Sequence, residues 1–426
     1  MKKNKTIRAL TVLAASLFSL DALTAGYFLV KHFKEKNSTV QTEENKTATE
    51  TQPPTEETTE TTTEIPTTTE PPDEIELAVN SMTLHEKVCQ MFIVRPEELT
   101  EGLDITIASE NTKNYLAEYP VGGIIYFSKN LESQTQISAV INQTKQYAQE
   151  TGCTPLFYSV DEEGGQVARC SESVGTTAFD SMYYYRGYGE ETAFANARII
   201  AGDIASLGFN LDFAPVADTW SNQYNTVIGT RAYSDDFSET AQLVASAVKG
   251  FREGGVFCTL KHFPGHGDTA EDSHNGTAVS YRTAEELRAN EYQAFKSGIM
   301  SGADMVMVGH ITVPELDTLP ASLSERIIQG ELRDYLGYNG VIITDSLGMG
   351  AVANIYSSDE LAVMAVQAGN DILLTPDNYI SAVSGIENAV RNGRISEERI
   401  NESVYRILEL KSQKMDIVKH GTSYEQ

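Results

Sequence analysis

The stretch Val256-Phe-Cys-Thr-Leu-Lys-His-Phe-Pro-Gly-His-Gly-Asp-Thr269 holds the pattern that indicates the fold. It opens with a short apolar run and continues into a Pro-Gly turn and a glycine-bearing loop. A run of this length bounded by turn residues is typical of a buried strand. Two ionisable residues, Lys261 and His262, stand where the run ends. We therefore interpret residues 256–261 as a strand that carries functional groups at its carboxyl end.

The same alternation of short apolar runs with amphipathic stretches extends from Leu77 to Met415, and it predicts an α/β fold. Eight strands with crossovers in this length match a (β/α)8 TIM barrel with insertions. A doubly wound open sheet is the alternative, but no glycine-rich nucleotide loop supports it. The expected strands are Val88–Val94, Val121–Phe127, Pro155–Val160, Phe209–Ala214, Val256–Lys261, Asp304–Val308, Gly340–Thr344 and Asp371–Leu374, with helical patterns at Thr192–Leu207, Thr240–Glu253, Ala284–Ser301 and Asp359–Ala368.

Ionisable residues gather where these runs end. The carboxyl ends of barrel strands form the catalytic face, so groups at these positions are candidates for function. The same groups on helices would be ordinary solvated surface. In chain order they are Asp161-Glu162-Glu163, the stretch from Asp212 to Asp218, Lys261-His262, His310, Asp345 and Asp377.

The loop after the fifth run continues to Asp272-Ser273-His274. A carboxylate close to an imidazole can orient the ring and raise its basicity, so Asp272 and His274 form a candidate acid/base pair. Two other interpretations stay open. One is a metal site made of His262, His266 and His274, although the spacing matches no standard zinc site. The other is a purely structural loop.

The run KHFPGHGDT with its Asp-Ser-His triplet resembles the N-acetylhexosaminidase branch of glycoside hydrolase family 3. The similarity extends in the correct order from Leu84 to Lys411. The fold that it implies is a (β/α)8 barrel, in agreement with the strand count. The other matching stretches are YPVGGIIYF, DEEGGQVAR, NLDFAPVADT, VIGTRAYS, PASLS with the pair Leu332-Arg333, VIITDSLGMGAV and RINESVYRILELK.

The resemblance implies a role for each matching position. Asp345 corresponds to the nucleophile that forms a covalent glycosyl-enzyme, and His274, paired with Asp272, corresponds to the general acid/base. Such a His–Asp dyad replaces the second carboxylate of the usual retaining glycosidase. The residues implied in sugar binding are Asp161, Arg169, Arg231, Lys261 and His262.

Two positions depart from the family pattern. Glu162 stands where relatives more often have Gln, and Ser346 stands where many have a second Asp. Neither change removes a catalytic group, but the extra carboxylate of Glu162 is expected to alter selectivity or nearby pKa values.

The implied function is a retaining β-N-acetylhexosaminidase that removes terminal, non-reducing β-linked N-acetylglucosamine and uses no metal or cofactor. The β-glucosidase or β-xylosidase branch is disfavoured, because its members take their acid/base from a following domain. A phosphorylase of the same family remains open. A catalytically inactive surface sugar-binding module is disfavoured because Asp345, Asp272 and His274 are all present.

The charge balance agrees with a neutral ligand. The chain has 32 basic and 60 acidic residues, a net charge of −28, which argues against nucleic-acid binding because that requires a basic surface. The four cysteines lack metal-type spacing, and Cys89 and Cys258 lie in apolar runs typical of buried thiols. A Cys153–Cys170 disulfide stays open, because we expect export.

Residues 1–36 are expected to direct export. An apolar run from Ala9 to Val30 has basic residues on both sides, as in an uncleaved signal anchor. Small residues at 24–26 favour the alternative, a cleaved signal peptide. Residues 37–76 are rich in Thr, Glu and Pro and predict a disordered stalk. We expect the catalytic domain at 77–415 and a tail at 416–426, on the outer face of a bacterial membrane or secreted, acting on peptidoglycan fragments, chitin oligomers or host glycans.

Overall fold

The computed structural model describes residues 73–103, 105–270 and 278–416. Its centre is an eight-stranded sheet in the order β11-β9-β7-β6-β3-β2-β1-β12, in which all neighbours run parallel. A parallel bridge between Ile343 and Ile372 joins the two ends. The sheet is thus barrel-like, as the eight apolar runs predict. The strands are β1 (Phe92–Val94), β2 (Gly123–Ile125), β3 (Phe157–Val160), β6 (Leu211–Asp212), β7 (Phe257–Phe263), β9 (Met305–Val308), β11 (Val341–Thr344) and β12 (Leu373–Leu374).

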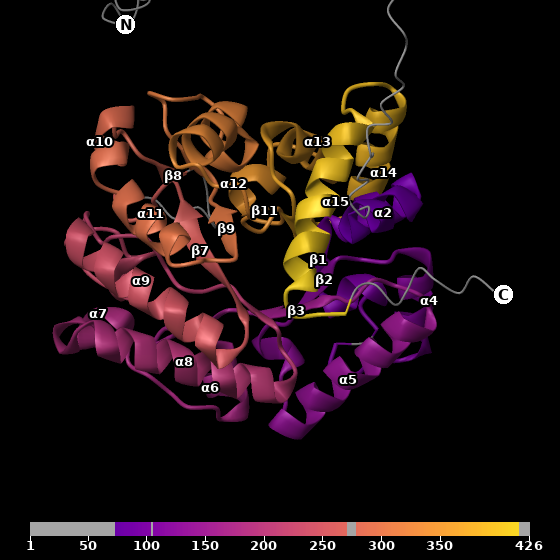
Figure 1. Ribbon diagram of the computed structural model, residues 1–426, viewed down its shortest axis with the longest axis horizontal. Coiled ribbons are helices and arrows are strands. Elements are labelled where there is room, and N and C mark those ends of the chain that lie inside the picture. Colours follow the sequence, from indigo (N-terminus) through magenta and orange to yellow (C-terminus); the bar gives the residue numbers. More distant parts are fainter. Residues whose placement is uncertain (1–72, 104, 271–277, 417–426) are drawn as a thin grey trace, which may run out of the picture. The chain divides into compact units, whose positions relative to one another are not determined.

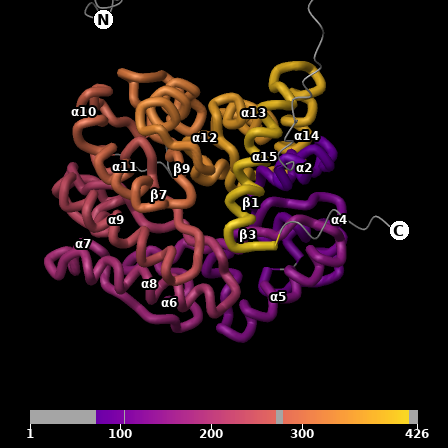
Figure 2. Tube along the Cα trace, viewed as in Figure 1, coloured from indigo at the N-terminus to yellow at the C-terminus, as the bar shows by residue number. Residues whose placement is uncertain are grey.

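Helices lie outside this sheet (Figure 1). They separate successive strands of the barrel, which is the arrangement of a (β/α)8 fold. In Figure 2 the colours follow one another around the sheet, and the last helices, α14 and α15, return to contact α2 and α3. The helices are α2 (Glu74–Ser81), α3 (Leu84–Gln90), α4 (Glu110–Glu118), α5 (Gln134–Glu150), α8 (Glu190–Leu207), α9 (Phe237–Gly254), α10 (Ala284–Ala289), α11 (Tyr292–Met300), η6 (Arg326–Tyr335), α13 (Ser358–Ala368), α14 (Tyr379–Arg391) and α15 (Glu397–Ser412).

Asp371 ties the last helix to the barrel. Its Oδ2 accepts hydrogen bonds from Arg333 Nη2 at 2.7 Å and from the backbone N–H of Ile342 at 2.9 Å. Its Oδ1 accepts from Ser403 Oγ at 2.7 Å and from Arg406 Nη1 at 3.1 Å. Because the carboxylate is fully buried, these partners replace the water that it loses on folding. The stretch RINESVYRILELK, which forms most of α15, is therefore fixed beside the amino-terminal ends of β11 and β12.

Most predicted elements differ from the observed ones by a few residues at their ends, and two of them divide into separate elements. The run Val88–Val94 divides between α3, which continues to Gln90, and β1, which begins at Phe92. A capping box of Thr83 and Glu86 starts α3, so the apolar residues at 88–89 form the inward face of a helix. The pattern at 284–301 is two helices, because the backbone of Asn290 leaves the helical region and brings Glu291 against Gly265.

All four cysteines are buried and free. Buried thiols were expected for Cys89 and Cys258, and this is confirmed. The Cys153–Cys170 disulfide that the sequence leaves open is not formed, because these residues lie at opposite ends of β3: Cys153 precedes the strand and Cys170 follows it. A strand of four residues spans roughly 13 Å, well beyond the reach of a disulfide.

Among the residues that the structure describes, no helix is long and apolar enough to cross a membrane. The predicted signal segment at 1–36 and nearly all of the linker at 37–76 lie outside these residues, as does the tail beyond 416. Those assignments therefore stay predictions.

Candidate active site

Six of the predicted site residues line one cavity of about 280 Å³ at the carboxyl ends of the strands. The sequence places them in separate motifs, up to 184 positions apart (345 − 161). The barrel brings them together because every strand ends at the same face. Asp272 and His274 lie outside the described residues, so their position stays a prediction. The six are Asp161, Arg169, Arg231, Lys261, His262 and Asp345.

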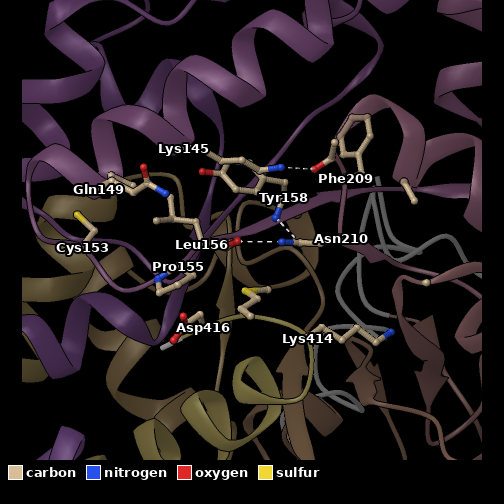
Figure 3. A pocket seen from close by; sticks show the side chains of 15 residues that line it. Lys145, Gln149, Cys153, Pro155, Leu156, Tyr158, Phe209, Asn210, Lys414 and Asp416 are labelled. Atoms are coloured by element: carbon tan, nitrogen blue, oxygen red, sulfur yellow. Dashed lines mark hydrogen bonds between the residues drawn. The ribbon is translucent and has the colours of Figure 1, made fainter. Parts of the chain in front are cut away.

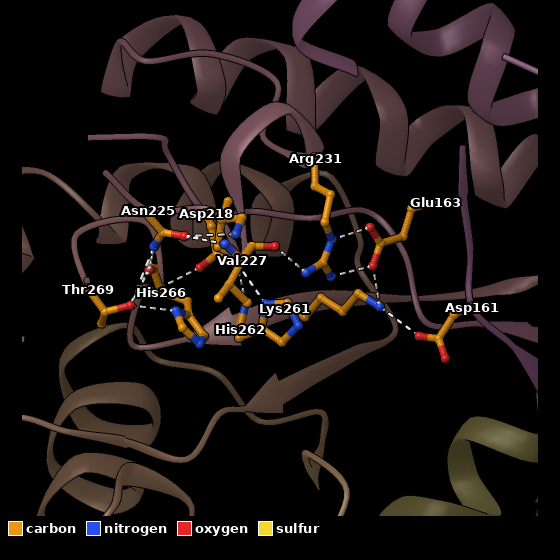
Figure 4. Close-up of polar contacts among 11 residues, drawn as sticks. Asp161, Glu163, Asp218, Asn225, Val227, Arg231, Lys261, His262, His266 and Thr269 are labelled. Atoms are coloured by element: carbon orange, nitrogen blue, oxygen red, sulfur yellow. Dashed lines mark hydrogen bonds and ion pairs between the residues drawn. The ribbon is translucent and has the colours of Figure 1, made fainter. Parts of the chain in front are cut away.

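Glu163 links two of the cationic side chains (Figure 4). Its carboxylate accepts two hydrogen bonds from Arg231, from Nε at 2.8 Å and from Nη2 at 2.7 Å. The same carboxylate lies 2.7 Å from Lys261 Nζ, which also donates to Asp161 Oδ1 at 2.7 Å. The Glu163 side chain is 0% exposed. Two cations and two carboxylates thus form one connected set on the wall of the cavity.

The charges of Glu163, Arg231 and Lys261 hold one another in the ionised form. Burial raises the pKa of Glu163, but attraction to Arg231 and Lys261 outweighs it and leaves the pKa well below its usual range. Burial lowers the pKa of Lys261, but attraction to Asp161 and Glu163 outweighs that effect and raises it above the ordinary value. Lys261 therefore presents a permanent ammonium donor to a ligand in the cavity.

Asp218 orients the imidazole of His262. Its Oδ2 lies 2.7 Å from His262 Nδ1 and accepts the backbone N–H of the same residue at 3.1 Å. Its Oδ1 accepts the backbone N–H of His266 at 2.6 Å. Burial raises the pKa of Asp218, but attraction to His262 outweighs it, so the pKa is lowered. With Nδ1 engaged, Nε2 is the remaining ring nitrogen through which His262 can bind a ligand.

Asp345 follows β11 directly and is held by the backbone. Its N–H donates to the carbonyl of Val308 at 2.9 Å, and its Oδ1 accepts the N–H of Ser346 at 2.7 Å. Burial raises the pKa of Asp345, but attraction to His262 and His310 and the Ser346 hydrogen bond outweigh it and lower the pKa. The carboxylate is therefore ionised at neutral pH. An ionised carboxylate on the cavity wall has the chemistry of a nucleophile.

Residues 83–410 match the family described as "Glycosyl hydrolase family 3 N terminal domain", which covers more than half of the chain. The chain belongs to glycosyl hydrolase family 3. The chain is 33% identical over 299 residues to a beta-hexosaminidase of Xylella fastidiosa, a match that covers 67% of this chain and 86% of the relative. It is 31% identical over 323 residues to beta-hexosaminidase A of Pseudoalteromonas piscicida, over 70% of this chain but only 54% of the relative.

A solved structure has the same fold. A family 3 beta-N-acetylglucosaminidase from Paenibacillus sp. str. FPU-7 superposes with a TM-score of 0.74 and 38% identity, over 81% of this chain and 65% of that chain. This chain thus spans about half to two thirds of the length of some relatives and most of the length of others. The predicted family is confirmed, and so is its barrel-like parallel sheet with surrounding helices.

The two departures from the family 3 pattern have structural roles. Glu162 is not among the residues that line the cavity, and its carboxylate accepts the backbone N–H groups of Cys170 at 2.6 Å and Ser171 at 2.9 Å. It therefore anchors the start of α6 (Arg169–Val174), whose first residue, Arg169, lines the cavity. Burial raises the pKa of Glu162 to about 7. Ser346 Oγ lies 2.7 Å from Thr375 Oγ1 and adds no charge beside Asp345.

Sequence reasoning assigned no role to Glu163 or Asp218. The DEEGG motif contains Glu163, and the sequence already predicts that Arg231 and Lys261 share one site. Two buried cations require a buried anion, and this requirement could have identified Glu163. The alternative metal site of His262, His266 and His274 stays a prediction, because His274 lies outside the described residues. Within 73–103, 105–270 and 278–416, no group of three His, Cys, Asp or Glu residues could hold a metal ion, and His266 Nδ1 lies 2.7 Å from Thr269 Oγ1.

A larger cavity of about 620 Å³ lies at the other end of the strands (Figure 3). Leu156 and Asn210, which line it, precede β3 and β6, so it opens near the amino-terminal ends. Two of its polar side chains bind backbone carbonyls of the lining: Lys145 donates to the Gly208 carbonyl at 3.2 Å, and Asn210 donates to the Leu156 carbonyl at 3.1 Å. The smaller cavity is the candidate active site, because it holds the convergent charges and lies at the catalytic face.

Proposed function

We propose that this family 3 protein hydrolyses terminal, non-reducing β-linked N-acetylglucosamine with retention of anomeric configuration. The observation that carries the proposal is the ionised carboxylate of Asp345 on the wall of a cavity that also holds Asp161, Arg231 and Lys261. Relatives named beta-hexosaminidase, and a family 3 structure named beta-N-acetylglucosaminidase, support the choice of sugar.

The reaction has two displacements. In the first, an Asp345 oxygen bonds to the anomeric carbon while the glycosidic C–O bond breaks, and His274 gives its proton to the departing oxygen. In the second, the now neutral His274 takes a proton from water, the water oxygen bonds to the anomeric carbon, and the bond to Asp345 breaks. Asp272 would hold the imidazole in the correct tautomer. The roles of Asp272 and His274 rest on the family resemblance.

The remaining residues would bind the sugar. Lys261, Arg231 and Arg169 can donate hydrogen bonds to hydroxyl groups and to the acetamido oxygen, and Asp161 can accept hydrogen bonds from hydroxyls. Glu163 fixes the two cations before a ligand arrives, so little reorganisation accompanies binding. No step in this scheme requires a metal or a redox cofactor.

A ring-fluorinated N-acetylglucosaminyl fluoride tests the nucleophile, because it slows the second displacement more than the first. We expect peptide mass spectrometry of the treated protein to find one added sugar, on Asp345. We expect NMR of the N-acetylglucosamine newly released from an ordinary substrate to show the β-anomer first. A label on another residue, or initial release of the α-anomer, would contradict the mechanism. Release of a sugar phosphate only in the presence of inorganic phosphate would favour the phosphorylase alternative.

We propose further that the domain acts outside the cell, either anchored or secreted. The support is the apolar run at 9–30 with basic flanks, followed by the Thr-, Glu- and Pro-rich segment at 37–76. Protease treatment of intact cells, with immunoblotting of cell and medium fractions, tests this proposal. Loss of the domain from the cells, or its presence in the medium, is expected; protection inside intact cells would contradict it.

A further inference from the structure

Aromatic side chains gather on two loops of the catalytic face. Tyr184, Tyr188 and Tyr224 are 67%, 77% and 86% exposed, far more than large aromatic residues usually are. The Tyr183 ring lies between two others, 5.1 Å from Trp220 and 6.2 Å from Tyr184 between ring centroids. Tyr188 and Tyr224 lie on the same two loops as these three rings, and we call the five residues the aromatic patch. An exposed aromatic cluster on a soluble domain commonly marks a binding surface.

Both loops belong to the rim of the candidate active site. The first, with α7 (Met182–Tyr185), follows β3, and Ser181 at its start packs against Gly165 so closely that a Cβ there would lie 2.4 Å from it. Gly165 lies in the turn of the hairpin whose first strand, β4 (Glu162–Gly164), carries Glu163, a lining residue of the cavity. The second loop follows β6 and carries Trp220 and Tyr224. It also carries Arg231, another lining residue, so both loops are joined to the wall of the cavity.

The second loop also contacts the segment that leads to the predicted acid/base. Asn222 N–H donates to the Gly267 carbonyl at 3.1 Å, and Asn222 Nδ2 donates to the Asp268 carbonyl at 3.1 Å. A Cβ on Gly267 would lie 1.7 Å from the Thr219 carbonyl, so the two segments are in direct contact. The proposed reaction releases a terminal sugar held in the cavity, so every further unit of a substrate chain lies on the leaving-group side. A surface beside the cavity would therefore meet the leaving-group part of the chain.

We propose that the aromatic patch binds sugar units on the leaving-group side of the scissile bond, so that the preferred substrates are chains of several β-linked N-acetylglucosamine units. This inference rests on the proposed function. The C–H faces of a pyranose ring stack on aromatic rings, and tyrosine hydroxyls can bond to sugar hydroxyls. An uncharged chain also avoids repulsion by a protein of net charge −28.

The centre of the patch is fixed before any ligand arrives. Tyr183 Oη donates to Asp235 Oδ2 at 2.8 Å. The guanidinium carbon of Arg186 lies 4.1 Å from the centroid of the Tyr183 ring, and Arg186 also pairs with Asp235. Side chains that are already held in place lose little conformational entropy on binding. This matters for a sugar chain, because each stacked ring contributes only a modest binding free energy.

Trp220 is the only tryptophan of the chain, so its fluorescence reports on the patch alone when excited where tyrosine does not absorb. The experiment titrates the Asp345→Asn protein, which cannot form the glycosyl-enzyme, with the tetramer of β-linked N-acetylglucosamine. We expect a saturable change in Trp220 emission. We expect Tyr184→Ala and Tyr224→Ala to raise the Kd about fivefold each. The matched control, Tyr335→Ala, removes a half-exposed tyrosine in η6 and should leave the Kd unchanged.

Hydrolysis supplies a second readout. N-acetylglucosaminyl fluoride has a single atom as its leaving group, so Tyr184→Ala and Tyr224→Ala should leave its kcat/KM unchanged while lowering kcat/KM for the tetramer about fivefold. No change in Trp220 emission with the tetramer, or equal losses on fluoride and tetramer, would overturn the role of the patch. Failure of the wild-type protein to hydrolyse the fluoride would instead refute the proposed function, a result that the binding titration does not share.

Discussion

Glu163→Gln is the perturbation that most directly tests the charge arrangement of the site. Gln keeps the size of the side chain but carries no charge. Even if its amide oxygen takes the place of Oε1, which faces both Arg231 Nη2 and Lys261 Nζ, its amide N–H group then faces Arg231 Nε. The wild-type carboxylate makes three contacts of 2.7–2.8 Å and is 0% exposed. Removing one partner from a buried ion pair costs about 3–5 kcal/mol, so we expect the free energy of unfolding to fall by about 3 kcal/mol or more.

Urea unfolding followed by the fluorescence of Trp220 measures this loss. The chain offers a matched control in Glu360, whose carboxylate also accepts two hydrogen bonds from one arginine, Arg394, at 3.0 and 2.9 Å. Those side chains are 44% and 47% exposed. Because solvent screens an exposed pair, Glu360→Gln should cost less than about 1 kcal/mol.

Kinetics give a second measure of the same change. Arg231 and Lys261 lose their common anchor in Glu163→Gln, so KM for an N-acetylglucosaminide should rise and kcat should fall. Glu360→Gln should change neither. If Glu163→Gln is no less stable than Glu360→Gln and binds substrate as well as the wild type, the reasoning that the buried carboxylate organises the site is refuted.

Three further variants test other buried charges. Asp371→Ala leaves three arginines near α15 without their shared carboxylate, and thermal unfolding should show a loss of about 3–5 kcal/mol; a loss below about 1 kcal/mol would contradict the role of Asp371. Burial lowers the pKa of Lys411 to about 7, so between pH 7 and 10.5 the unfolded state binds more protons than the folded state. As the pH falls through this window, Lys411→Met should therefore become more stable relative to the wild type. A difference in unfolding free energy that does not change with pH would contradict the lowered pKa. Burial raises the pKa of Glu162 from 4.5 to about 7, so between these pH values the folded state binds more protons than the unfolded state. As the pH rises from 4.5 to 7, the free energy of unfolding of Glu162→Gln should therefore increase relative to that of the wild type, by up to about 3 kcal/mol. Unfolding free energies of the two proteins that change in parallel with pH would contradict the raised pKa.

Much of the fold could be predicted because the barrel strands are short, buried and parallel. Each such strand appears as an apolar run that ends in a turn, and its carboxyl end lies on the catalytic face. That rule sufficed to bring Asp161, Lys261 and Asp345 to one cavity. It did not separate α3 from β1, because the inward face of a short buried helix has the same apolar composition as a strand.

The contacts within the site could not be predicted in the same way. Whether Glu162 or Glu163 of the DEEGG motif pairs with the cations depends on the alternation of side chains at the end of β3 and on the turn that follows. In the structure, Glu163 accepts from Arg231 and Lys261, whereas Glu162 caps α6. The exposed tyrosines of the aromatic patch give no periodic signal either, since they lie in single helical turns and in a loop, which are too short to show a period.

The central claim is that Asp345 is the nucleophile of an N-acetylglucosaminidase. Its most direct test is the hydrolysis of an aryl β-N-acetylglucosaminide and of an aryl β-glucoside by the purified protein and by Asp345→Ala. We expect release from the N-acetyl substrate alone, and its loss by at least about a thousandfold in Asp345→Ala, because no other group supplies the covalent step. Equal activity on the glucoside, or activity that survives Asp345→Ala, would contradict the account.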